Sequence, residues 1–138
     1  MHSEIKIIIT LVVVCSLFSM SGARLATATF REDFKKTKCF DRDIGAGPDK
    51  VLQVVALNKK IFKKEMCHQF MKVKCMGPPK CKYDEVMYVE IADGCTSDEL
   101  LQDEDICLHK YVWDTLADTT NNPTRMIVDI EGPFKGNM

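Results

Sequence analysis

The number of cysteines limits the ways in which this chain can fold. A short N-terminal segment, residues 1–23, has the pattern of a secretory signal peptide. Lys6 precedes an apolar run too short to span a bilayer, and Ser21 and Ala23 stand at the small-residue positions of a cleavage site. Cleavage after Ala23 removes Cys15 and leaves an even number of cysteines in an oxidising compartment. We therefore expect a secreted, extracellular protein held by three disulfides, formed by Cys39, Cys67, Cys75, Cys81, Cys95 and Cys107.

The cleavage site and the disulfide pairing each leave an alternative open. The pair Ala26 and Ala28 offers a second small-residue cleavage site. Six cysteines can pair in many ways, so spacing alone does not give the connectivity. We favour Cys67 or Cys75 bonding Cys107, because either bridge would join the two helices predicted below.

The stretch 47–75 has the longest apolar periodicity outside the leader, and it predicts an amphipathic helix. Pro48 suits the first helical position, and Asp49 places a negative charge in the first turn. Seven apolar residues fall on one face of such a helix: Val51, Val54, Val55, Ile61, Phe62, Met66 and Phe70. The candidate basic binding face consists of Lys59, Lys60, Lys63 and Lys64. A solvated lysine face on a core helix is the simpler interpretation of the same pattern.

A second helix is predicted from Thr96 to about Ala117. Thr96 and Glu99 have the spacing of a capping box, and three acidic or hydroxyl side chains follow in the first turn. A shorter helix is expected around residues 30–38, where Phe30 and Phe34 lie one turn apart. These three segments make the predicted fold mainly α, with two main amphipathic helices.

Two further segments could form strands. Residues 83–92 alternate apolar side chains at Met87, Val89 and Ile91, which favours one short strand over a short capped helix. Residues 119–138 are predicted as a loop and C-terminal tail, with a short strand as the alternative. The expected organisation is a signal peptide at 1–23, a helical disulfide-stabilised domain at 24–118, and this tail.

Charge divides the chain into a basic and an acidic half. Residues 31–82 carry 14 Lys or Arg against 6 Asp or Glu, whereas residues 83–138 carry 3 against 13. The simpler interpretation is that the two halves attract one another in the fold. The alternative is that the basic half meets an extracellular protein or an anionic surface. The chain has no arginine cluster, so a nucleic-acid partner is not expected, and no stretch after the leader predicts transmembrane anchoring.

The sequence lacks the motifs that are typical of catalysis. The mature chain has two histidines, His68 and His109, each next to or near a cysteine that is expected to be oxidised. It carries no nucleophile elbow, zinc-protease or phosphate-loop motif, so we expect no enzyme activity, no metal site and no cofactor.

A secreted, disulfide-bonded domain without catalytic motifs predicts a toxin-like effector that binds a protein or membrane target. The alternatives are an extracellular carrier of a small apolar ligand and a hormone-like signalling protein. The cysteine spacing matches no family that we recognise.

Overall fold

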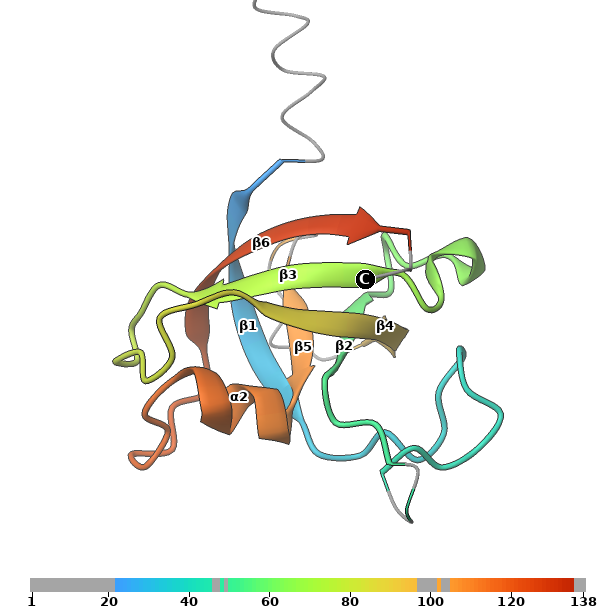
Figure 1. The fold of residues 1–138 in the computed structure, drawn as a ribbon, viewed down its shortest axis with the longest axis horizontal. Helices are drawn as coiled ribbons and strands as arrows, with labels where there is room; N and C mark the ends of the chain where they lie inside the picture. The colour runs from blue at the N-terminus through green and yellow to red at the C-terminus, as the bar shows by residue number, and fades with distance from the viewer. Residues whose placement is uncertain (1–21, 46–47, 49, 97–101, 103–104, 136–138) are drawn as a thin grey trace, which may run out of the picture.

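The computed structural model describes residues 22–45, 48, 50–96, 102 and 105–135. Its elements in chain order are β1 (Arg24–Arg31), β2 (Val54–Asn58), the short 3₁₀ helix η1 (Lys64–Met66), β3 (Phe70–Cys75), β4 (Met87–Cys95), β5 (Ile106–His109), α2 (Lys110–Leu116) and β6 (Met126–Phe134). Within the described residues the strands close into a barrel in the order β1-β5-β2-β4-β3-β6 (Figure 1). Strand β1 pairs with β5 in parallel, and so does β2 with β4, whereas the other neighbours are antiparallel.

Two apolar clusters hold the barrel. The first fills the interior with inward-facing residues of the strands and with Val112, Trp113 and Leu116 of α2. The second lies on the outside of β2, β4 and β5, where the loop between β1 and β2 covers them with Phe34 and Ile44. Strand β2 is therefore apolar on both of its faces.

The predicted mainly α fold is wrong. The described residues of the stretch 47–75 form β2, η1 and β3 instead of one helix. Every residue of Val54–Asn58 is buried, because one face of β2 lines the interior and the other lies under the loop. A strand buried on both faces reads as a continuous apolar run, which also fits part of a helical stripe.

Other predicted elements also differ from the structure. The short helix expected at 30–38 is the end of β1 and a loop. The helix expected from Thr96 is replaced, where the structure describes it, by β5 and the short α2. Residues 97–101 and 103–104 of that helix, and residues 1–21 of the predicted signal peptide, lie outside the described residues. The signal peptide therefore stays a prediction.

Two strand predictions agree with the structure. The alternation in 83–92 belongs to β4, in which Met87, Val89 and Ile91 are buried and Tyr88 is exposed. The strand alternative for the C-terminal region corresponds to β6, which pairs with β1 on one side and β3 on the other. The C-terminal region therefore closes the barrel.

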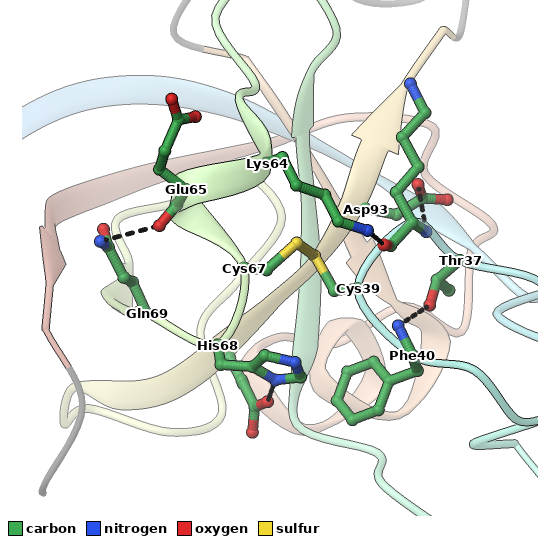
Figure 2. Close-up of a disulfide and its surroundings, with 11 residues drawn as sticks. Thr37, Cys39, Phe40, Lys64, Glu65, Cys67, His68, Gln69 and Asp93 are labelled. Carbon is green, nitrogen blue, oxygen red and sulfur yellow. Dashed lines mark hydrogen bonds and ion pairs between the residues drawn. A yellow bond between two sulfur atoms is a disulfide. The ribbon is translucent and has the colours of Figure 1, made fainter.

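The six cysteines form three disulfides: Cys39–Cys67, Cys75–Cys81 and Cys95–Cys107. The expected bond from Cys67 or Cys75 to Cys107 is wrong, because Cys67 pairs with Cys39, Cys75 with Cys81 and Cys107 with Cys95. The first bridge joins the long loop after β1 to the segment after η1, as Figure 2 shows. The third ties the end of β4 to β5.

His109 caps α2, and this role makes the stability of the fold sensitive to pH. Its Nδ1 accepts a hydrogen bond from the Tyr111 N–H at 3.0 Å, and its ring stacks on Phe34 at 5.4 Å between centroids. Burial lowers the pKa of His109 below its ordinary value of 6.5. The unfolded chain therefore binds a proton more readily than the folded one. Protonation would also turn the accepting nitrogen into a donor and break the cap.

We expect acidification from pH 7.5 to pH 5 to lower the free energy of unfolding through His109. The stability is lost as the pH falls through 6.5 towards the lowered pKa of the folded state. Urea unfolding at the two pH values measures this loss. The variant His109→Asn keeps a capping side chain and does not titrate, so it should lose less stability than the wild type. Equal losses of unfolding free energy in the wild type and in His109→Asn would contradict the role of His109 in this pH dependence.

Candidate functional site

A cleft at the ends of β1 and β4 carries a largely buried ion pair and is the candidate functional site. It has a volume of about 430 Å³, within the usual range of ligand sites. Its lining residues are Phe30, Arg31, Asp93, Gly94, Cys95, Thr96 and Cys107. They come from the end of β1, the end of β4, the residue after it, and β5. We call it the Arg31–Asp93 cleft.

A β-bulge places Asp93 at this position. Along β4, Ile91 pairs with Val55 and Asp93 pairs with Ala56, so Ala92 is an extra residue opposite β2. A bulge of this kind changes the direction of the side chains that follow it. Ala92 packs in the outer apolar cluster, and the next residue brings its carboxylate to the cleft.

Both carboxylate oxygens of Asp93 have partners. Oδ2 accepts a hydrogen bond from Nη2 of Arg31 at 2.8 Å, and Oδ1 accepts one from the Lys38 N–H at 3.1 Å. The side chains of Asp93 and Arg31 are 9% and 25% exposed. The Arg31 guanidinium also donates to the Asp33 carbonyl at 2.7 Å and lies 4.5 Å from the centre of the Phe34 ring. The pair is thus fixed from several sides.

One aromatic ring, Phe30, lines the cleft, and a second, Phe62, contacts its lining residue Gly94. The Phe30 ring packs 5.2 Å from the Trp113 ring, and the Lys110 Nζ lies 4.8 Å from its centre. Phe62 lies next to Gly94, where an added Cβ would be 3.4 Å from its ring. Apolar ring faces next to fixed hydrogen-bonding groups suit a ligand that is itself both apolar and rich in hydroxyls.

The carboxylate of Asp93 lines the cleft, and both of its oxygens are hydrogen-bonded. Glycoside hydrolysis uses two carboxyl groups on either side of the bond that is cleaved. Among the described lining residues Asp93 is the one carboxylate, and Arg31 and Lys38 occupy its oxygens. In the described part of the chain every buried side-chain nitrogen or oxygen has a partner.

The lysines of the candidate basic binding face lie elsewhere. Lys59, Lys60, Lys63 and Lys64 are exposed in the connection between β2 and β3 and do not share one helix face. The Lys64 Nζ donates to the Lys38 carbonyl beside the Cys39–Cys67 disulfide (Figure 2). A binding role for these lysines stays a prediction. Of the predicted site residues, Cys95 and Cys107 line the cleft.

Sequence reasoning missed Arg31, Asp93 and Phe30. Of the three, only Phe30 supports a sequence prediction, that of the short helix expected around residues 30–38. Arg31 and Asp93 are 62 residues apart in the chain, and no short motif links them. They meet because β1, β5, β2 and β4 are successive neighbours in the barrel.

Neither a metal-binding cluster nor a membrane-spanning helix is found among the described residues. Over these residues no group of three or more His, Cys, Asp or Glu side chains could hold a metal ion. No helix in the described part of the chain combines the length and the apolarity needed to cross a bilayer.

The barrel resembles that of an expansin. No protein-family model and no curated protein matches the sequence. Two solved structures of the expansin from Clavibacter michiganensis match the fold, one of the apo protein and one of a mutant in complex with cellohexaose. Each has a TM-score of 0.56 and 17% identity, and covers 78% of this chain and 48% of the expansin chain. The similarity shows a shared fold, and this chain spans about half the length of the expansins.

The expected toxin-like effector is wrong, as are its helical carrier and hormone-like alternatives. The three disulfides are present, but they hold a β-barrel whose fold is similar to that of an expansin.

Proposed function

We propose that this protein is a secreted, non-catalytic binder of neutral polysaccharide that takes a segment of a β-glucan chain into the Arg31–Asp93 cleft. The observation that carries the proposal is the cleft itself, which combines the fixed Arg31–Asp93 ion pair with the Phe30 ring. The solved expansin with the same fold was crystallised with cellohexaose, which supports a glucan as the ligand class. The paired state of Asp93 favours binding over hydrolysis.

Secretion belongs to the same proposal. The predicted signal peptide directs the chain out of the cell, and three disulfides suit an oxidising compartment. A polysaccharide partner would be met in that compartment.

Co-sedimentation of the disulfide-bonded protein with insoluble cellulose tests this function. We expect saturable binding without release of reducing sugar. The variant Thr96→Leu should weaken binding by about tenfold, about 1.4 kcal/mol, because it fills the cleft from an exposed position.

The matched control is Thr124→Leu, which makes the same change at an exposed loop position outside the cleft and should bind as the wild type does. Equal binding by Thr96→Leu and Thr124→Leu would place the ligand elsewhere. Release of reducing sugar would contradict the non-catalytic part of the proposal.

A further inference from the structure

A second pocket, separate from the cleft, gathers all of the tyrosines in the chain. The sequence has three tyrosines, and Tyr83, Tyr88 and Tyr111 all line one pocket of about 300 Å³. Their exposed fractions are 37%, 42% and 44%. The other lining residues are Gln53, Val86, Met87 and Thr115. We call it the tyrosine pocket.

Backbone hydrogen bonds, a disulfide and regular secondary structure hold the three tyrosines in place. The N–H groups of Lys82 and Tyr83 both donate to the Leu116 carbonyl, at 2.9 and 3.3 Å, which attaches this loop to α2. The Cys75–Cys81 disulfide closes the preceding turn. Tyr88 is part of β4, and Tyr111 lies in the first turn of α2. A pocket preformed in this way loses little conformational entropy when a ligand binds.

The side chains that line the tyrosine pocket are uncharged, although charged groups lie beside two of them. The Tyr83 hydroxyl donates to Glu85 at 3.4 Å, and the Lys72 Nζ lies 5.9 Å from the centre of the Tyr88 ring. Among the residues lining the tyrosine pocket there is no Asp, Glu, Lys, Arg or His. The pocket offers flat ring faces together with phenol hydroxyls, the Gln53 amide and the Thr115 hydroxyl. A hexopyranose ring presents C–H groups on its faces and hydroxyls at its edge, so it can stack on a tyrosine while its hydroxyls form hydrogen bonds.

The tyrosine pocket and the Arg31–Asp93 cleft lie at opposite ends of β4. Met87 and Tyr88 begin the strand, and Asp93 lies near its end. Tyr88 and Asp93 are five positions apart in the chain, which corresponds to about 16 Å along a strand. Each site can therefore hold its own segment of glycan.

We propose that the tyrosine pocket is a second binding site for neutral glycan, in which sugar rings stack on the tyrosines. This inference rests on the proposed polysaccharide-binding function. Two linked contacts raise the affinity for a polymer surface through effective concentration, whereas a short oligosaccharide fills one site at a time. The tyrosine pocket thus makes binding to polymeric glycan stronger than the Arg31–Asp93 cleft alone would.

The test measures binding isotherms of the full disulfide-bonded protein on insoluble cellulose. Tyr88→Ala and Tyr111→Ala should each weaken binding by about fivefold or more, as expected for aromatic anchors. Tyr88→Phe and Tyr111→Phe keep the ring and should retain most of the affinity. Leu25→Ala, an exposed apolar residue outside both sites, is the matched control and should bind as the wild type does. Thermal unfolding of each variant shows that it is folded.

The outcomes separate this inference from the proposed function. If the wild type binds cellulose and the Tyr88→Ala and Tyr111→Ala variants bind equally well, the tyrosine pocket is not a glycan site and the function stands. If the wild type does not bind at all, both proposals fail. If a proline-rich peptide binds and only this binding is lost in the alanine variants, the pocket is a peptide site and the inference is overturned.

Discussion

Replacing Trp113 with alanine should lower the free energy of unfolding by about 3–5 kcal/mol. Trp113 is among the largest fully buried side chains in the described part of the barrel. It projects from α2 into the interior and packs against the Phe30 ring at 5.2 Å. The change removes this contact and leaves a cavity that the surrounding strands cannot fill. Urea unfolding monitored by circular dichroism measures the loss.

The same helix provides a matched control. Tyr111 lies two residues earlier on α2, and its side chain is half-exposed, so Tyr111→Ala should cost less than about 1 kcal/mol. Similar losses for Trp113→Ala and Tyr111→Ala would mean that α2 does not pack into the barrel as described.

The variant Asp93→Ala should lose about 2–4 kcal/mol of stability. It leaves the Arg31 guanidinium without its carboxylate partner in a site that is mostly closed to water, and the Lys38 N–H without its acceptor. Chemical denaturation of the wild type, Asp93→Ala, Arg31→Ala and the double variant forms a mutant cycle. We expect a coupling free energy of about 1–3 kcal/mol between the two residues.

An exposed ion pair in the same protein serves as the comparison. Lys110 and Asp114 are 2.9 Å apart on α2, with side chains 34% and 46% exposed. Water screens such a pair, so the Lys110–Asp114 cycle should give about 0.3–0.5 kcal/mol. Equal couplings in the two cycles would contradict the description of the Arg31–Asp93 pair as buried and fixed.

Local patterns predicted some of the barrel correctly. Strand β4 has one face in the interior and one facing out, so its side chains alternate and the alternation around Val89 favours a strand. Strand β2 has no polar face, because Phe34 and Ile44 cover its outer side. No pattern in the sequence shows that the loop preceding β2 folds back over its outer side, and the apolar run therefore resembles a helix.

Local sequence patterns do not predict the candidate site. The barrel joins β1 to β4 through β5 and β2, which brings Arg31 to Asp93 across a long separation in the chain. The direction of the Asp93 side chain depends on a bulge at Ala92, and a single extra residue leaves no recognisable signal in one sequence. Cysteine count predicted the number of disulfides, whereas their pairing depends on the same long-range topology.

A cellohexaose titration followed by amide NMR shifts tests the central claim, that the Arg31–Asp93 cleft binds glucan, most directly. The account predicts saturable shifts for the amides of Arg31, Gly94 and Thr96, which line the cleft. It predicts much smaller shifts for the exposed amides around Thr124, on the loop before β6. Saturating binding that leaves the three cleft amides unmoved, or no binding at millimolar cellohexaose, would contradict it.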